Sequence, residues 1–285
     1  GITNRILSEL KKRAEKEPDA YIKLWETFGT VLKEGLYEDF ERRDELLELA
    51  RFKTTKSGTG WRSLKEYLAD LKENQTAIYH VTADNPAQAA ASPQLEGFRA
   101  RDVEVLLLSD PVDHFWVRMA TGYEGKPFRS VTQGAADITS IARTDAGEED
   151  EAPTTDIATL AALVKQTLGD TVGEVRASER LAESPVCLVA KEGALDRRLE
   201  KMIRRQEADT APGTAPDLEL NPRHALIRHL AGEATATGAS ERMSDAAWLL
   251  WDEATILEGE APQDPAAFAA RLTRLLLSGA TKMDG

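Results

Sequence analysis

The sequence predicts an α/β and α+β protein: a helical lead-in and a small three-layer α/β unit with parallel strands, followed by an α+β domain that ends in helices. Three observations support this class. Apolar residues recur at spacings of three and four near the N-terminus. Three apolar, β-branched runs then alternate with helical stretches. Beyond an acidic segment, short strand runs give way to helices.

The composition limits the class of protein. A length of 285 residues predicts about two domains. A formal net charge of −13 disfavours nucleic acid and anionic membranes as partners. No apolar stretch approaches the roughly 18 residues that span a bilayer and no signal-peptide pattern opens the chain, so we expect a cytoplasmic protein. The single cysteine, Cys187, excludes a disulfide framework and a multi-thiolate zinc site, and its apolar neighbours predict burial.

Helices are predicted through most of the first 70 residues. Apolar residues at helical spacing indicate two helices before Gly35, which is placed to end the second one in a left-handed conformation. A third helical run around Leu46 gives way to a loop at residues 53–60, where Gly, Ser and Thr gather. Ser63 and Glu66 then match a capping box, so the next helix is expected to start at Ser63.

The α/β unit is predicted by three strand runs, at residues 77–83, 103–109 and 127–132. Helical segments lie between them, and the second runs over about 111–121. Asp84 or Asn85 can cap the first of these segments, with Pro86 in its first turn. Strands separated by helices are expected to pair in parallel.

A domain boundary is predicted where acidic residues gather without any Lys or Arg, at 144–156. We therefore expect a first domain over 1–132, an acidic linker over 133–156 and a second domain over 157–285. In the second domain we expect a helix ended by Gly169, paired strands at GEVRASE and PVCLVAKE, and a short strand LEL at 218–220. Helices are then predicted over 222–231, 241–257 and 264–278, with Asn221 and Pro222 as cap and first turn of the first.

Catalytic motifs are absent from the sequence. The pair Gly125-Lys126 lacks the earlier glycine and the following hydroxyl of a phosphate loop, and no hydrolase, zincin or dinucleotide motif occurs. The five-residue spacing of His224 and His229 does not suit a metal site on one helix face. Asp110 and Asp113 flank a strand end, where α/β sites often lie, but their place beside Pro111 favours a role at a helix start. We therefore predict no catalytic, cofactor-binding or metal-binding residues.

Two apolar segments resist a purely structural interpretation. In His114-Phe115-Trp116-Val117, consecutive positions point about 100° apart, so one aromatic is expected to be exposed, for a partner or for a neighbouring domain. In the segment 196–205, apolar residues share one face with five basic residues around them. That helix can be an ordinary solvated one or a surface for varied apolar partners.

The last two predicted helices each carry an apolar face that needs cover, from the domain body or from a second copy. Their apolar residues are Ala247, Leu250, Trp251, Ala254 and Leu257, and then Phe268, Leu272, Leu275 and Leu276.

Several long blocks of the sequence resemble one family. The chain closely resembles the heat-shock protein 90 chaperone family, bacterial HtpG type, in blocks spread over most of its length. These are LWETFGTVLKEGLYED (24–39), RFKTT (51–55), SLKEYLADLKENQTAIYHVTAD (63–84), SPQLEGFRARDVEVLLLSDPVD (92–113), GKPFRSV (125–131) and LELNPRH (218–224).

The resemblance implies a fragment: the end of the family's middle domain, joined to its C-terminal dimerisation domain. The family's ATP-binding domain, and the middle-domain arginine that reaches the ATP phosphates, would lie upstream of Gly1. ATP and Mg²⁺ are therefore expected only in the full-length family, and this chain is expected to hold no cofactor and not to be an enzyme.

The resemblance also implies binding roles. A homodimer is expected through the two C-terminal apolar faces, as the base of a clamp that holds partly unfolded client proteins. No acidic peptide tail follows Gly285, so tetratricopeptide co-chaperones are not expected. A purely structural dimerisation module is the alternative, and a small-molecule enzyme at Asp110 and Asp113 is a more remote one. The implied client-binding residues are Phe115, Trp116, Arg118, Leu195, Leu199, Met202 and Ile203.

Overall fold

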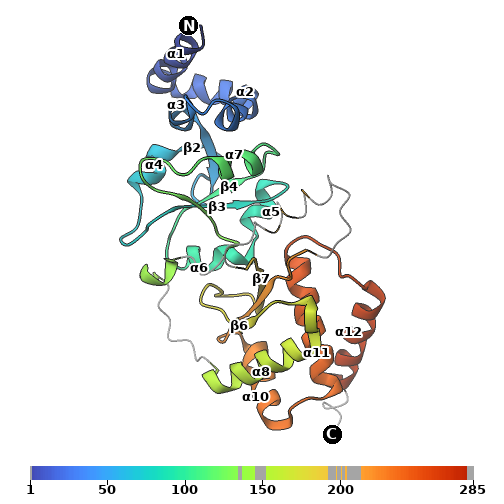
Figure 1. The fold of residues 1–285 in the computed structure, drawn as a ribbon. Coiled ribbons are helices and arrows are strands. Elements are labelled where there is room, and N and C mark those ends of the chain that lie inside the picture. Colours follow the sequence, from blue (N-terminus) through green and yellow to red (C-terminus); the bar gives the residue numbers. More distant parts are fainter. Residues whose placement is uncertain are drawn as a thin grey trace. The chain divides into compact units, whose positions relative to one another are not determined.

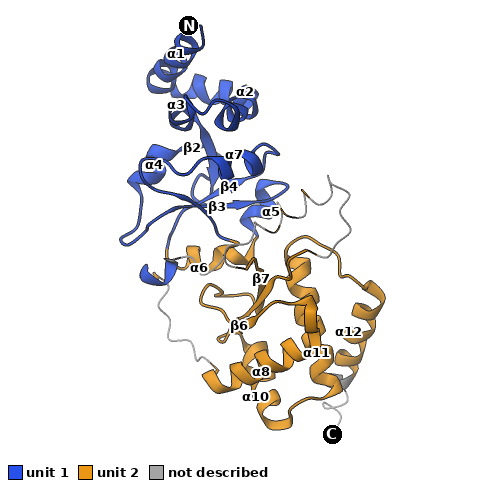
Figure 2. Ribbon diagram, in the orientation of Figure 1, with its two compact units in different colours: residues 1–91, 102–131, 136–142 blue, residues 92–101, 132–135, 143–285 orange. Residues whose placement is uncertain are grey.

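The computed structural model describes residues 2–133, 137–144, 152–191, 197, 200, 203 and 213–280. The chain divides into two compact units (Figure 2). Unit 1 comprises residues 1–91, 102–131 and 136–142, and unit 2 comprises residues 92–101, 132–135 and 143–285. The segment 92–101, which the sequence analysis assigned to the first domain, thus belongs to unit 2.

Unit 1 begins with three helices, α1 (Ile2–Lys16), α2 (Pro18–Glu38) and α3 (Arg43–Leu49) (Figure 1). Pro18 occupies the first turn of α2, where its missing N–H costs nothing. The prediction that Gly35 ends this helix is wrong, since α2 continues to Glu38. Gly35 instead allows a close approach: a Cβ there would lie 2.8 Å from Cδ1 of Leu46 on α3.

The sheet of unit 1 has the order β2-β1-β4-β3-β5. The predicted parallel pairing is confirmed for its last three strands, since β3 pairs in parallel with both β4 and β5. The expected loop at residues 53–60 is partly wrong, because β1 pairs antiparallel with β2 and with β4 and alternates half-buried and buried residues. The strands are β1 (Arg51–Thr54), β2 (Arg62–Ser63), β3 (Ile78–Thr82), β4 (Val105–Leu108) and β5 (Phe128–Ser130).

Short helices connect these strands. The predicted capping box is confirmed: the Ser63 hydroxyl accepts from the Glu66 N–H, and the Glu66 carboxylate accepts from the Ser63 N–H at 2.7 Å. Asn85 caps the next helix by accepting from Gln88 N–H. The helices are α4 (Leu64–Ala69), α5 (Pro86–Ala90) and α7 (Asp113–Met119), with a 3₁₀ turn at Asp137–Ser140.

Unit 2 includes a segment that precedes β4 in the chain, formed by a 3₁₀ turn (Pro93–Leu95) and α6 (Glu96–Arg99). The buried Glu96 carboxylate accepts hydrogen bonds from the backbone N–H groups of residues 182, 183 and 184, and from the Ser184 hydroxyl. The amide of Gln94 donates to the Leu188 carbonyl at 2.6 Å. Side chains of 92–101 therefore hold a loop and a strand that follow about ninety residues later.

The sheet of unit 2 has the order β6-β8-β7, with β6 (Val175–Ala177), β7 (Val186–Val189) and β8 (Asp217–Leu220). The two strands predicted to pair with each other, β6 and β7, do not: both pair with β8, which lies between them. Cys187 on β7 is buried as predicted, and this burial raises the pKa of its thiol.

Within the described residues, unit 2 also contains four longer helices, and buried apolar residues of the first three form one core. Gly169 ends the first of them with a positive φ of 56°, as predicted. The predicted start at Asn221 is wrong: His224 caps the second helix, its Nδ1 accepting from the Leu226 N–H. Asn221 is fully buried and donates instead to the Ser184 carbonyl. The helices are α8 (Thr154–Leu168), α10 (Ala225–Thr237), α11 (Glu241–Leu257) and α12 (Pro265–Ala280).

Candidate functional site

Helix α7 follows β4 in unit 1 and packs against α2 (Figure 1). The turn that precedes α7 is closed by a side chain of the helix itself, because the Asp113 carboxylate accepts a hydrogen bond from the Asp110 N–H at 3.0 Å. The expectation that these two aspartates stand at a helix start is confirmed for Asp113, the first residue of α7. This turn fixes the direction in which α7 leaves the sheet.

The two consecutive aromatics of α7 have opposite surroundings. Trp116 is completely buried, with its ring 5.7 Å from that of Phe52 and 5.3 Å, edge-on, from that of Phe128. Phe115 keeps 43% of its surface exposed, so one of the pair is exposed, as predicted. Trp116, which the resemblance assigned to client binding, therefore has no surface to offer, because its ring fills the core.

A buried lysine beneath α7 was not foreseen. Lys33 of α2 is only 5% exposed, and its Nζ lies 2.9 Å from Oδ1 of Asp113 and 2.8 Å from Oδ2 of Asp110. Asp113 also accepts from the indole N–H of Trp116, at 2.6 Å. The signal that could have revealed this lysine is its helical spacing from the buried residues Gly29 and Leu36. Both aspartates thus pair with Lys33 beneath α7.

An exposed apolar surface lies over α7 and the end of α2, formed by Tyr37, Phe40, Phe115 and Met119; we call it the α2–α7 patch. The rings of Tyr37 and Phe115 are 6.0 Å apart. Phe40 and Met119 are joined through Arg43, whose guanidinium stacks 4.5 Å from the Phe40 ring and donates to the Met119 carbonyl at 2.7 Å. Phe40, Phe115 and Met119 are each more than 40% exposed.

Arg118 is exposed on α7, between the two patch residues of that helix.

The second predicted client-binding segment is only partly described. Leu195, Leu199 and Met202 lie outside the described residues, and Ile203 is half-buried. Arg197 forms a bidentate pair with Glu258, the C-cap of α11, at 2.8 to 3.1 Å. This pair joins Arg197 to the end of α11.

Most of the predicted dimerisation residues of α11 are buried in the core of unit 2. Ala247, Leu250, Trp251 and Ala254 are buried in its core, so they already have the cover that the sequence left open between the domain body and a second copy. Leu257, at the helix end, is 38% exposed.

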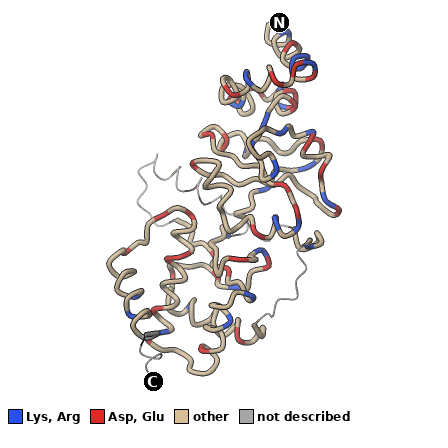
Figure 3. Tube along the Cα trace, turned by 180° about the vertical axis from the view of Figure 1, so that it is seen from behind, with Lys and Arg blue, Asp and Glu red and all other residues tan. Residues whose placement is uncertain are grey.

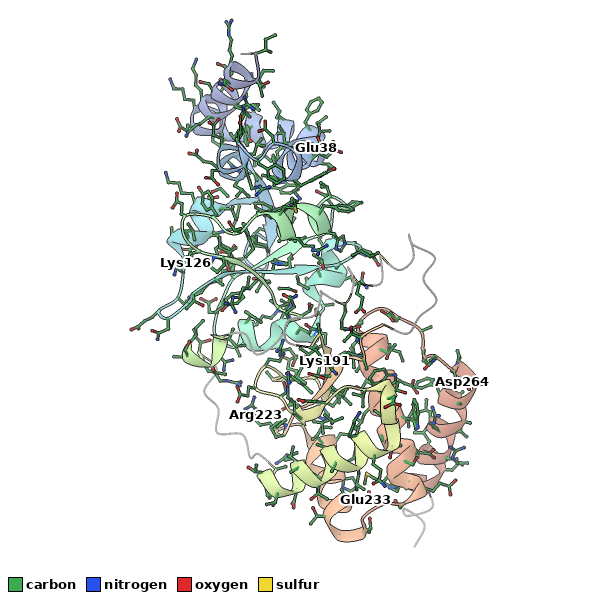
Figure 4. The ribbon with its side chains drawn as sticks, in the orientation of Figure 1. Glu38, Lys126, Lys191, Arg223, Glu233 and Asp264 are labelled. Atoms are coloured by element: carbon green, nitrogen blue, oxygen red, sulfur yellow. The ribbon has the colours of Figure 1, made fainter. Side chains whose placement is uncertain are left out.

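Helix α12 presents a row of Phe268, Leu272, Leu275 and Leu276, which we call the α12 row. Leu272 and Leu276 are 41% and 66% exposed, and the other two are half-buried. Asp264, labelled in Figure 4, caps the helix by accepting from the Ala267 N–H at 2.9 Å.

Helix α12 is attached to α11 by charged groups. Arg274 donates twice to the Asp245 carboxylate, at 2.7 Å each, and this hydrogen bonding lowers the pKa of Asp245. Arg271 stacks 4.9 Å from the Trp248 ring. These contacts leave Leu272 and Leu276 of the α12 row exposed.

Other chemistry finds little support. In the described part of the chain, no three His, Cys, Asp or Glu side chains gather as a metal site would require. None of the described helices is both long and apolar enough to cross a membrane. In the view of Figure 3, basic and acidic residues are interspersed along both units.

The chain belongs to the Hsp90 family, since the family model described as Hsp90 protein matches residues 2–284. Its relatives include proteins named chaperone protein HtpG. The one from Azorhizobium caulinodans is 55% identical over 287 residues, covering 98% of this chain and 44% of the relative.

Two further relatives carry the same name. Those from Mesorhizobium japonicum and Rhizobium meliloti are each 51% identical, over 284 and 283 residues, and cover 99% and 96% of this chain. The match takes in 45% and 43% of these relatives. The chain thus spans less than half the length of the curated relatives it matches.

Proposed function

We propose that this chain is part of an ATP-dependent Hsp90-type chaperone, in which it binds apolar segments of partly unfolded client proteins and forms a homodimer. The observation that carries the proposal is the α2–α7 patch, where Phe115 and Met119 project from a helix whose other aromatic is locked in the core. The relatives are named as chaperones, which supports the same conclusion.

The chemistry of the patch suits varied apolar partners. Aromatic rings offer a large contact area with little entropy to lose, and the unbranched thioether of methionine adapts to different shapes. Phe115 and Met119 are four residues apart, so they lie on the same face of α7. A client segment can cover both at once and bury the apolar surface that water now meets.

The α12 row supports self-association. Leu272 and Leu276 are exposed one helical turn apart, which is the spacing with which helices pack in a bundle. Two copies joined by this row would form the base of a clamp, and each copy would carry one α2–α7 patch. In the full-length protein, closure around ATP would remodel the space between the arms.

Client binding is tested by replacing both exposed patch residues of α7, as Phe115→Ser with Met119→Ser. We expect the affinity for a reduced, carboxymethylated and fluorescently labelled model protein to fall about tenfold or more, because two apolar contacts are lost. Fluorescence anisotropy measures this affinity. Val31→Ser is the matched control, since Val31 is 61% exposed on α2 but lies outside the patch. Unchanged affinity in the double variant would leave the structural dimerisation module as the better description.

Dimerisation is tested in the same set by Leu272→Ser with Leu276→Ser. Light scattering coupled to size exclusion should give twice the chain mass of 31.3 kDa for the unaltered protein and a shift toward the single mass for this variant. Leu226→Ser, on α10 and 40% exposed, is the control and should leave the mass doubled. A single mass for the unaltered protein at every concentration would refute the dimer.

A further inference from the structure

The apolar pattern of α7 does not determine which of its two consecutive aromatic residues is buried. Phe115 and Trp116 are consecutive aromatics, about 100° apart around the helix axis. A rotation of α7 by that angle would exchange which ring enters the core between Phe52 and Phe128. Since either aromatic can supply apolar volume there, burial of hydrophobic surface alone discriminates weakly between the two settings.

Polar contacts determine which of the two rings enters the core. The indole N–H of Trp116 donates to Asp113 at 2.6 Å, and a phenylalanine ring has no such donor. Asp113 is itself 1% exposed and is neutralised by Lys33, with 2.9 Å between Oδ1 and Nζ. In the rotated setting, the Asp113 carboxylate would be carried away from Lys33, and separating this buried pair is costly. The hydrogen bond from the Trp116 indole to Asp113 lies within α7 and turns with it, so it ties the indole to the carboxylate that Lys33 holds.

We propose that Lys33, Asp113 and Trp116 form a rotational lock that fixes the setting of α7 about its axis, so that Phe115 and Met119 are displayed. Lys33 and Asp113 act as positioning residues, because they act on the displayed side chains through Trp116. This inference rests on the proposed function for its consequence, client binding, but the lock itself is a property of the chain alone.

The chain holds α7 at its other end as well. Arg43 donates to the Met119 carbonyl at 2.7 Å and to the Leu36 carbonyl of α2 at 2.7 Å. A cation from α2 thus holds the start of α7, and a cation at the start of α3 holds its end. Both cations belong to the helical lead-in, which gives those helices a role in presenting the patch.

The decisive variant removes the lock without leaving a buried charge: Lys33→Met with Asp113→Leu. The chain is labelled with 5-fluorotryptophan, and the ¹⁹F signal of Trp116 is assigned by its loss in Trp116→Phe. The lock predicts one solvent-insensitive Trp116 signal in the unaltered chain. In the double variant it predicts a second signal that shifts with D₂O content, together with about tenfold weaker client binding.

A second ion pair of unit 1 provides the matched control, as Arg62→Met with Glu104→Leu. Its atoms Nε and Oε1 are 2.9 Å apart, and Glu104 is 3% exposed. Neutralising this pair should leave the Trp116 signal single and solvent-insensitive. A second Trp116 signal in this control would mean that any lost ion pair loosens α7, and would overturn the lock.

The outcomes separate the lock from the proposed function. A single unchanged Trp116 signal in the Lys33 and Asp113 double variant would overturn the lock. A divided signal with unchanged client affinity would support the lock and refute the client-binding role of the patch. Should that variant not fold, hydrogen exchange of the Trp116 indole in the unaltered chain decides: strong protection supports the lock, and exchange as fast as an exposed indole overturns it.

Discussion

Helices α7 and α12 are both attached to their units by carboxylate–cation pairs, but the two pairs lie in different surroundings. The side chains of Lys33 and Asp113 are 6% and 1% exposed, whereas those of Arg274 and Asp245 are 52% and 12% exposed. Separating a buried pair leaves two charges without hydration, which is costly. Separating a half-exposed pair lets water hydrate both charges. The difference shows that similar contacts can fix one helix firmly and hold another lightly.

The largest effect is expected at the buried pair. Asp113→Ala removes the acceptor of the Trp116 indole and one of the two carboxylates beside Lys33, so we expect a loss of about 3–5 kcal/mol in the free energy of unfolding of unit 1. Urea denaturation followed by tryptophan fluorescence measures it. Asp110→Ala is the comparison, because Asp110 is more exposed and should cost clearly less. Equal losses in both variants would contradict the assigned difference between the two carboxylates.

A much smaller effect is expected at the exposed pair. Asp245→Ala should lower the free energy of unfolding far less than Asp113→Ala, and it should act locally, as faster amide hydrogen exchange in α12. Cap contacts such as that of Asp264 remain in this variant. If Asp245→Ala destabilised the chain as strongly as Asp113→Ala, burial would not be what separates the two helices.

The smallest effect is expected from acid. Hydrogen bonding from Arg274 lowers the pKa of Asp245 in the folded chain below its unfolded value of about 3.9. This pair therefore contributes its full stabilisation above about pH 4 and loses it as the pH falls through the folded pKa. Amide exchange of α12, corrected for its intrinsic pH dependence, should be constant from pH 7 to 5 and rise toward pH 3. Asp245→Asn should remove that rise; a rise that persists would place its origin elsewhere.

Much of the fold was predictable because its signals are local. The apolar runs of β3 and β4 and the box of Ser63 and Glu66 each lie within a few residues of sequence, and all are found in the structure. The strand β1 was missed although β2 lies close in sequence, because its other partner, β4, lies more than fifty residues away, as in the register of Lys53 with Leu107. The central place of β8 was missed for the same reason, since strand order depends on pairing that sequence spacing does not encode.

The candidate site was predictable from the sequence except for the identity of its exposed aromatic residue. Helical periodicity indicates that one of Phe115 and Trp116 is exposed, but it cannot say which. The choice depends on Lys33, about eighty positions away and recognisable only as a charge on an otherwise buried helix face. The α11 residues were predicted as an apolar face, and the core they fill also contains strands and helices from elsewhere in unit 2.

The hydrogen bonds from residues 182–184 to the Glu96 carboxylate have consequences for co-translational folding and for truncation of the protein. Residues 92–101 leave the ribosome before β4 of unit 1 and long before the loop at 182–184 that their carboxylate binds. They must therefore wait for a partner that is not yet made. A truncated chain beginning at residue 143 would lack this carboxylate, and three consecutive backbone N–H groups would lose their acceptor. A truncation at the acidic segment would thus remove residues 92–101, which precede that segment in the sequence but belong to unit 2.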